Sequence, residues 1–362
     1  MRVSKPKVLI YARREEKPEI IQTLIDIGCD VQFGDPAWTL PRGEHEDAFV
    51  EAARDAVVLM GTSIRHTPIS RRILEASQRL RLVAKYTVGV DDVDTDAATE
   101  LGIMVSHAPT EENVFAVAEQ AVAMMLGILK KVRERDAAVR AGEWRTPASS
   151  TTYFGSRMTD GHGGLTVGLV GLGRIGTRVA QLLAPWRVRV IAYDPHIPPA
   201  QFLLAGVPSV DYETLLREAD IVSFHVTLTK ETRFMLDAEQ VAMMKPGAIV
   251  VNTARGKVIR EQAVADALRD GRLRAAAIDA FEEEPLPADS PLRALPQHQT
   301  LFSPHAAAYN GSGELFAGIN WALRSVLTAL KGDIPDNVYN REVLPRWRER
   351  FGGASVLDAE QT

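Results

Sequence analysis

The sequence predicts an α/β fold made of two doubly wound parallel-sheet domains, with the second domain inserted in a discontinuous first one. Short β-rich runs alternate with amphipathic helical stretches along most of the chain, which is the pattern of parallel sheets covered by crossover helices. A chain of 362 residues usually divides into two cores. A helical stretch at 314–331 exceeds what the second sheet needs, so we expect it to cross back to the first domain.

The first sheet is predicted from five β-rich runs near the N-terminus. Between them, segments such as 20–27 and 70–77 place apolar side chains at helical spacing. We expect these elements to form one compact domain of the flavodoxin-like kind. The predicted strands are 7–12, 31–33, 56–61, 80–86 and 103–106.

One long helix is predicted from residue 113 to about residue 140. Its apolar residues recur at intervals of three and four, and its basic residues gather near the end, which suits the helix dipole. The following segment, 147–164, is rich in Ser, Thr and Gly and is predicted to be a loop. We expect the helix to act as the hinge between the two α/β domains.

The second sheet is predicted from six further β-rich runs with periodic helices between them, a number that suits a doubly wound fold. We therefore expect a first domain of residues 1–112 and 307–345, an inserted domain of residues 113–306, and a polar C-terminal tail at 346–362. The predicted strands are 166–170, 188–193, 221–225, 248–252, 275–278 and 300–302.

Composition excludes several classes of partner. The formal net charge of -5 and the pI near 6.0 give no wide basic field, so we expect no nucleic-acid partner. Cys29 is the only cysteine, so an intramolecular disulfide is impossible and secretion gains no support. No stretch approaches the roughly 20 apolar residues of a membrane span. We expect a cytoplasmic protein that acts on a small molecule and has no membrane partner.

A glycine-rich turn follows the first strand of the second set. It consists of Gly171, Leu172, Gly173, Arg174, Ile175 and Gly176. The first two glycines allow a tight turn and a close backbone approach to a pyrophosphate, and the third lets the next helix pack on the strand. The N-terminus of that helix offers free N–H groups to phosphates. Arg174 is expected either to touch the pyrophosphate or to be a solvated first-turn residue.

A carboxylate ends the next predicted strand. Asp194 follows Gly176 with 17 residues between them, close to the spacing at which an acidic residue binds a ribose diol. Its alternative role is that of a turn residue before Pro195. Because a carboxylate would repel a 2′-phosphate, the sequence predicts a Rossmann domain that binds NAD rather than NADP.

Polar clusters follow three later strands of this domain, at 252–256, 279–285 and 303–305. Strand C-termini are where doubly wound folds bind ligands. Reduction of a 2-oxo acid needs a cation for the carboxylate or carbonyl, a proton donor that titrates near neutrality, and a group that orients the donor. Arg255 and His305 supply the first two. The spacing alone does not decide which of Glu282, Glu283 and Glu284 supplies the third.

At this point the sequence resembles the D-isomer-specific 2-hydroxyacid dehydrogenases, a family that includes phosphoglycerate, glycerate, D-lactate and formate dehydrogenases. The resemblance covers about residues 80 to 340 and is specific, because its motifs occur in the family's order. These motifs are Val88-Gly89-Val90-Asp91, Val117-Ala118-Glu119, the glycine turn with Asp194, the run 220–226, Asn252-Thr253-Ala254-Arg255-Gly256, the run 279–285 and Ser303-Pro304-His305.

The resemblance implies a role for each matching catalytic residue. It implies that Arg255 binds the carboxylate and carbonyl of the substrate, that His305 is the acid and base, and that Glu284 pairs with His305. Val88 and Gly89 resemble the loop of the other domain that receives the substrate carboxylate. Each residue also has a structural alternative, such as an ion pair for Arg255.

The same resemblance places further residues around the cofactor. Asp279 looks like the residue that meets the nicotinamide carboxamide. Thr253 and Ala254 lie in the matching cofactor segment. His225 ends a strand that faces the cofactor cleft, and we interpret it either as structural or as part of the cofactor lining. The family's long helix implies a homodimer.

The sequence leaves two alternatives open. Arg65 lies where phosphoglycerate dehydrogenases of this family have an arginine that faces the phosphate, so a phosphoglycerate dehydrogenase is one of them. The same fold also serves as an NAD(H)-sensing corepressor that binds short peptides, which is a binding module rather than an enzyme. Departures from the family pattern, such as Thr87 and Ala306 to Tyr309, affect the choice of substrate and not the reaction class.

Overall fold

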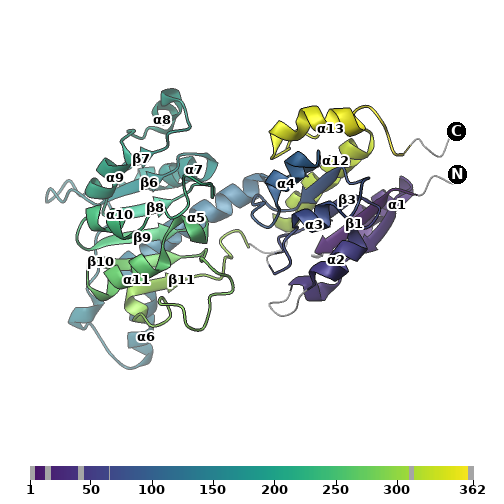
Figure 1. The fold of residues 1–362 in the computed structure, drawn as a ribbon. Helices are drawn as coiled ribbons and strands as arrows, with labels where there is room; N and C mark the ends of the chain where they lie inside the picture. Colours follow the sequence, from purple (N-terminus) through teal and green to yellow (C-terminus); the bar gives the residue numbers. More distant parts are fainter. Residues whose placement is uncertain (1–4, 13–17, 40–44, 65, 310–313, 358–362) are drawn as a thin grey trace. The chain divides into compact units, whose positions relative to one another are not determined.

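The computed structural model describes residues 5–12, 18–39, 45–64, 66–309 and 314–357. The chain divides into two compact units, each described by itself (Figure 1). The first unit comprises residues 1–113 and 310–362, and the second comprises residues 114–309. The first unit therefore joins segments from both ends of the chain, which carry the purple and yellow ends of the colour scale in Figure 1.

The first unit holds a five-stranded parallel sheet in the flavodoxin-like order β2-β1-β3-β4-β5. Helices α2, α3 and α4 supply apolar side chains to the core on one face, and α1, α12 and α13 supply them on the other. The strands are β1 (Lys7–Ala12), β2 (Asp30–Phe33), β3 (Ala56–Gly61), β4 (Leu82–Lys85) and β5 (Met104–Ser106), and the helices are α1 (Pro18–Asp26), α2 (Glu46–Ala53), α3 (Arg71–Leu74), α4 (Thr95–Glu100), α12 (Glu314–Leu330) and α13 (Leu344–Phe351).

The second unit holds a six-stranded parallel sheet in the order β11-β10-β9-β8-β6-β7. One face packs on α9, α10 and α11, and the other on α5, α7 and α8. The strands are β6 (Thr166–Val170), β7 (Arg189–Tyr193), β8 (Ile221–Phe224), β9 (Ala248–Asn252), β10 (Leu273–Ile278) and β11 (Thr300–Phe302), and the helices are α5 (Glu111–Lys130), α6 (Val132–Arg140), α7 (Arg174–Leu183), α8 (Pro199–Ala205), α9 (Tyr212–Glu218), α10 (Ala238–Met243) and α11 (Glu261–Arg269).

The strand order indicates where the second sheet binds a ligand, namely at the carboxyl ends of its strands, which we call the ligand edge. An isolated parallel bridge joins Ala192 of β7 to Ser209, on the open side of β7. This bridge stands where the Rossmann fold has its third strand. With it, the order matches the Rossmann pattern, whose direction reverses between β6 and β8. The prediction of two doubly wound parallel sheets is confirmed.

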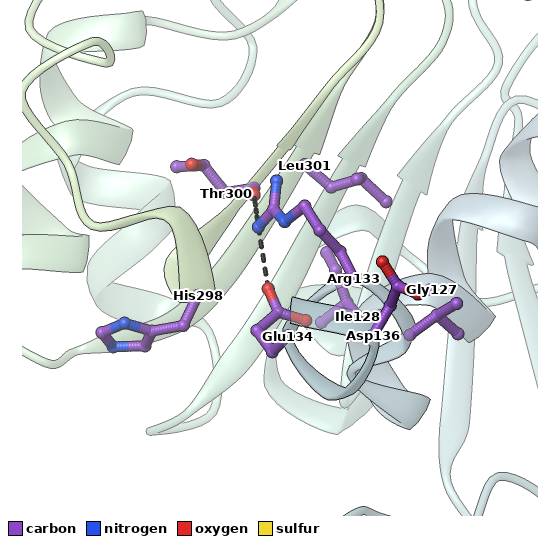
Figure 2. A pocket seen from close by; sticks show the side chains of 9 residues that line it. Gly127, Ile128, Arg133, Glu134, Asp136, His298, Thr300 and Leu301 are labelled. Carbon is purple, nitrogen blue, oxygen red and sulfur yellow. Dashed lines mark hydrogen bonds and ion pairs between the residues drawn. The ribbon is translucent and has the colours of Figure 1, made fainter. Parts of the chain in front are cut away.

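The prediction of a single long helix from residue 113 to about residue 140 is wrong in one respect. The structure breaks it into α5 and α6 at Lys131, which adopts the left-handed conformation with φ of 50°. Arg133 then turns toward β11 and donates a hydrogen bond to the carbonyl oxygen of Thr300 at 2.8 Å, and it also contacts Glu134 (Figure 2). These tertiary contacts stabilise a break that helical periodicity does not reveal.

Residues 346–357, expected to belong to a polar C-terminal tail, instead pack against the first unit. Helix α13 extends to Phe351, and the side chain of Trp347 is fully buried in the first core. The indole Nε1 of Trp347 donates to the carbonyl oxygen of Arg81 at 3.0 Å. Val356 and Leu357 also pack against this core, so the segment covers the first sheet. The segment is polar in its overall composition, but its apolar residues lie on one face and pack against the core.

Contrary to the expectation that no apolar stretch approaches a membrane span, α5 is long and apolar enough to cross a membrane by length and composition. Its mean hydropathy reaches 1.3, and half of that window is buried in the structure. The buried residues of α5, among them Ala118, Met125 and Leu129, pack in the second core. Packing on the second sheet therefore accounts for the apolar face of this helix.

Candidate active site

The glycine turn connects β6 to α7, and its three glycines have different structural roles. Gly171 has φ of +93°, and a Cβ there would lie 2.8 Å from the carbonyl oxygen of His225. A Cβ on Gly176 would lie 2.2 Å from the carbonyl oxygen of Gly171, so only glycine lets the helix pack this closely. A Cβ on Gly173, the N-cap of α7, would meet no atom of the described residues within 4 Å. The space in front of Gly173 therefore fits a pyrophosphate.

The other residues of this turn, Leu172, Arg174 and Ile175, lie between its glycines, and Asp194 contacts the turn. Arg174 begins α7 and is exposed, while Ile175 packs against the second core. Asp194 follows β7, and its Oδ2 accepts a hydrogen bond from the N–H of Leu172 at 2.9 Å. Its Oδ1 accepts from the N–H of His196 at 3.0 Å. The carboxylate thus closes a turn and also holds the glycine loop, and its binding of a ribose diol stays a prediction.

Two polar atoms lie buried without a partner among the residues that the structure describes at this edge. They are Nδ1 of His225, which follows β8, and Oγ1 of Thr253, which follows β9. Nε2 of His225 lies 2.9 Å from the hydroxyl of Ser223, and burial lowers the pKa of His225 to about 4. Thr253 is 7% exposed, and the neighbouring Ala254 is also buried. Unpartnered buried donors and acceptors are costly, which suits a site completed by a ligand.

Arg255 is held by the backbone around it. Asn252, the last residue of β9, donates from Nδ2 to the carbonyl oxygen of Arg255 at 2.9 Å. Gly256 follows, and a Cβ there would lie 1.8 Å from the carbonyl oxygen of Phe281. Arg255 Nη1 donates to the carbonyl oxygen of Ala254 at 2.8 Å. The close approach at Gly256 therefore brings the arginine turn against the segment that carries Glu284.

Glu284 and His305 form a pair. Oε1 of Glu284 lies 2.8 Å from Nδ1 of His305, and the two side chains are 15% and 29% exposed. The same oxygen accepts a hydrogen bond from the N–H of Phe281 at 2.9 Å. A carboxylate in contact with Nδ1 fixes the tautomer and favours the protonated imidazole. Of the three adjacent glutamates, the structure brings Glu284 to the histidine.

Asp279 supports the turn on which His305 sits. His305 adopts the left-handed conformation with φ of 52°, and its N–H donates to the carbonyl oxygen of Asp279 at 2.8 Å. The buried carboxylate accepts from the N–H groups of Ala306 at 2.9 Å and Ala307 at 3.2 Å. These bonds hold the backbone of the turn that carries His305, and a contact with a carboxamide would use the remaining lone pairs.

Val88 and Gly89, expected to bind the substrate, follow β4 in the first unit. Thr87 donates from Oγ1 to the carbonyl oxygen of Gly89 at 2.9 Å, and the hydroxyls of Thr87 and Ser63 are 3.3 Å apart. The carbonyl oxygen of Val88 lies 3.2 Å from Nδ1 of His107. Arg65 lies outside the described residues. Arg255, Glu284 and His305 are together in the second unit, and the Val88 loop belongs to the first.

The sequence reasoning missed a buried ion pair behind that loop. Nζ of Lys85 contacts Asp92 and donates to the carbonyl oxygen of Thr62 at 3.2 Å, and the side chains of Lys85 and Asp92 are 0% and 4% exposed. Oδ2 of Asp92 also accepts from the N–H of Ile64 at 2.7 Å. A lysine at the end of an otherwise apolar strand was the available signal, because a buried charge requires a partner.

A separate cavity of about 390 Å³ lies where α5 meets α6, beside β11 (Figure 2). It includes none of the residues expected at the active site. Its lining is Gly127, Ile128, Val132, Arg133, Glu134, Asp136, His298, Thr300 and Leu301.

Three comparisons with known proteins bear on these residues. Residues 122–307 match the model of the D-isomer specific 2-hydroxyacid dehydrogenase NAD binding domain. The chain is 41% identical over 301 residues to the D-3-phosphoglycerate dehydrogenase of Mycobacterium leprae, covering 81% of this chain but 54% of that enzyme. It therefore spans about half the length of the phosphoglycerate dehydrogenases that it matches.

Other relatives match along nearly their full length. The chain is 33% identical to the glyoxylate reductase of Thermococcus litoralis, covering 94% of this chain and 98% of that enzyme. The crystal structure of a glyoxylate reductase from Paecilomyes thermophila superposes with a TM-score of 0.79 at 25% identity, covering 93% and 99% of the two chains. These relatives are enzymes, which does not favour the corepressor alternative. The chain belongs to the D-isomer specific 2-hydroxyacid dehydrogenase family and contains its NAD-binding domain.

Proposed function

We propose that the protein is an NAD-dependent oxidoreductase that interconverts a D-2-hydroxy acid and the corresponding 2-oxo acid. The observation that carries the proposal is the contact between Glu284 and His305, next to Arg255 at the ligand edge of the family's NAD-binding domain. An acid and base, the carboxylate that orients it and a cation for the substrate are the groups that this reaction needs from the protein.

The cofactor is NAD, held by the glycine turn and by Asp194, with His225, Thr253, Ala254 and Asp279 lining the rest of its site. The open space at Gly173 and the unpartnered atoms of His225 and Thr253 support this assignment. When bound, NAD(H) donates or accepts the hydride. The carboxylate of Asp194 disfavours a 2′-phosphate by charge repulsion.

The chain's own residues handle the substrate and the proton. Arg255 binds the carboxylate and polarises the carbonyl of the 2-oxo acid. His305 donates the proton to the carbonyl oxygen from Nε2, because Nδ1 is engaged by Glu284. Glu284 stabilises the imidazolium that precedes the transfer. In the reverse direction, His305 accepts the proton from the hydroxyl group.

We assign the substrate domain to residues 1–112 and 307–345, and the NAD-binding domain to residues 113–306. The compact units at 1–113 with 310–362 and at 114–309 support this division. We also place the protein in the cytoplasm, on the basis of its single, buried cysteine.

A homodimer is part of the proposal. Helix α6 has no buried residue, and large apolar side chains are exposed along it and in the loop that follows. These are Val132, Val139, Trp144, Tyr153 and Met158, all more than half exposed. A second copy that covers this surface would remove it from water. Sedimentation of the wild type and of Trp144→Ser tests this, because the variant should shift the equilibrium toward monomer.

The test of function is NADH oxidation with glyoxylate, hydroxypyruvate, pyruvate, 2-oxoisocaproate and phosphohydroxypyruvate. We expect turnover with at least one acid, and a loss of about 100- to 10,000-fold in His305→Asn with NADH binding nearly intact. His298→Asn, at an exposed histidine of the same unit, is the matched control. Equal turnover in His305→Asn and wild type would refute the proposal, and preference for phosphohydroxypyruvate would identify a phosphoglycerate dehydrogenase.

A further inference from the structure

The segment that carries Glu284 has no regular secondary structure to hold it. Residues 281–285 follow β10 as a series of bends. Within the segment, the N–H of Phe281 donates to Oε1 of Glu284, the oxygen that also contacts His305. The position of this oxygen therefore depends on what fixes the backbone from Phe281 to Glu284.

Two glutamates fix that backbone by a reciprocal pair of hydrogen bonds, which we call the glutamate clasp. Oε1 of Glu282 accepts from the N–H of Glu261 at 2.6 Å. Oε1 of Glu261 accepts from the N–H of Glu282 at 2.6 Å. Glu261 is the first residue of α11, where N–H groups have no partner within the helix. The clasp thus joins a helix terminus to the middle of the Glu284 segment.

The charges around the clasp are unfavourable for a contact that serves packing alone. Glu261 is 7% exposed, and burial is the main cause that raises its pKa, with the neighbouring carboxylates of Glu282 and Glu283 adding to it. Hydrogen bonds with the N–H of Glu282 and the side chain of Ser290 lower the pKa and offset part of this rise. Arg260 offsets part of this charge, at 3.7 Å from Glu282 and 3.5 Å from Asp237. A neutral side chain of similar size would fill the same space without placing a second carboxylate beside Glu282.

The clasp lies two residues from the catalytic carboxylate and next to the substrate arginine. A Cβ on Gly256 would lie 1.8 Å from the carbonyl oxygen of Phe281 and 2.4 Å from the N of Glu282. Because these backbones are in close contact, a displacement of residue 282 moves both Phe281 and the turn that follows Arg255. The contacts run from α11 through Glu282 and Phe281 to Glu284 and His305.

We propose that Glu261, through the glutamate clasp, is a positioning residue for the Glu284–His305 pair. The inference rests on the function proposed above for that pair. With the clasp intact, Glu284 stays at hydrogen-bond distance from Nδ1 of His305, and the protonated imidazole is favoured. Without it, the carboxylate leaves this position for part of the time, and the imidazole loses its proton at a lower pH.

Variants of the two glutamates test the clasp. Glu261→Ala and Glu282→Ala each remove one of its bonds, and Glu261→Gln keeps an oxygen that accepts from the N–H of Glu282. Glu283→Ala removes an exposed carboxylate from the same segment and is the matched control. If Glu261→Ala fails to fold, Glu282→Ala still tests the clasp, because the side chain of Glu282 is 24% exposed.

We expect kcat for 2-oxo acid reduction to fall about 10-fold in Glu261→Ala and Glu282→Ala, with the Kd for NADH unchanged. The pH at which activity declines on the basic side should move down by about one pH unit, because His305 must be protonated in this direction. Glu261→Gln should retain the wild-type pH profile and most of kcat. Glu283→Ala should match the wild type.

An imidazole titration by NMR, with His305→Asn for assignment, separates failure of the clasp from failure of the proposed function. The titration midpoint of His305 should be lower in both alanine variants whether or not the protein turns over any acid. Folded alanine variants with the wild-type midpoint would overturn the proposal and leave the clasp as a stabilising contact only. An equal shift in Glu283→Ala would also overturn it, because net charge rather than position would then be responsible.

Discussion

The polar groups at the carboxyl ends of the two sheets are satisfied in different ways. In the first unit, the charged groups behind the Val88 loop pair within the protein, since Asp92 contacts Lys85 and accepts from the N–H of Ile64. In the second unit, Nδ1 of His225 and Oγ1 of Thr253 lack partners among the described residues. In the first unit the paired charges stabilise the loop, although Oγ of Ser106 at the end of β5 is also buried without a partner among the described residues. In the second unit the unpartnered atoms include Nδ1 of His225, whose backbone packs against Gly171 of the glycine turn, and this position suits a ligand.

The largest effect should come from breaking the buried ion pair of the first unit. Lys85→Met leaves the carboxylate of Asp92 buried without its cation, so the free energy of unfolding should fall by about 3–5 kcal/mol. Urea denaturation measures this. Arg54→Met is the control, because its pair with Glu51 is more than 60% exposed and should contribute under about 1 kcal/mol. Equal losses in the two variants would contradict the role assigned to burial.

Two glycines sharpen the comparison within the second edge. Gly176→Ala should lower the free energy of unfolding by about 1–3 kcal/mol, because its Cβ meets backbone 2.2 Å away. Gly173→Ala meets only open space, so it should leave stability within about 0.5 kcal/mol and weaken NADH binding. Thermal unfolding and NADH titration check both variants. Unchanged NADH affinity in Gly173→Ala would place the pyrophosphate elsewhere.

Asp194→Ala tests the choice of cofactor. Removal of the carboxylate removes its repulsion of a 2′-phosphate, so the ratio of kcat/KM for NADH to that for NADPH should fall about 10-fold. The affinity for NADH should also decrease, since the N–H of Leu172 loses its acceptor. An unchanged ratio would leave Asp194 with its turn-closing role alone.

Thr253→Val tests whether the unpartnered hydroxyl serves a ligand. The Kd for NADH should rise about 3- to 10-fold, and stability without NADH should stay equal or increase, because the hydroxyl has no partner among the residues that the structure describes. Ser106→Ala removes an unpartnered buried hydroxyl from the first unit and should leave NADH binding unchanged. Thr253→Val with wild-type affinity would remove the support that this atom gives to the cofactor site.

The last prediction concerns pH. Burial lowers the pKa of His225 from 6.5 to about 4, so the unfolded chain binds more protons than the folded one between these values. The contribution of neutral His225 is therefore complete above about pH 6.5 and is lost as pH falls toward 4. His225→Gln should show a shallower loss of stability across this window in urea denaturation at several pH values. An equal slope in both proteins would contradict the assignment.

The sequence predicted the features whose physical causes are local. The glycine turn, the strand that ends at Asp194, and the parallel sheets follow from backbone geometry and from hydrophobic periodicity. The partner of His305 was narrowed to three adjacent glutamates by spacing, and it was the family resemblance that selected Glu284. Residue types at strand ends thus predicted the kinds of group in the candidate site, while the choice of glutamate needed the family resemblance.

Features that depend on distant segments were not predictable in this way. The break at Lys131 depends on contacts of Arg133 with residues about 165 positions away, and the burial of Trp347 depends on the carbonyl of Arg81. The bonds from Asp279 to the turn after His305 join residues more than 20 positions apart, and so do the bonds of the glutamate clasp. Hydrophobic periodicity carries no information about such pairings.

Hydrogen–deuterium exchange with and without saturating NADH tests most directly the claim that the open edge of the second unit is the cofactor site. We predict that NADH protects peptides that contain residues 171–177 and 252–256, while peptides that contain the Lys85–Asp92 pair exchange at the same rate. Absence of protection at the glycine turn, or protection confined to the first unit, would contradict the account.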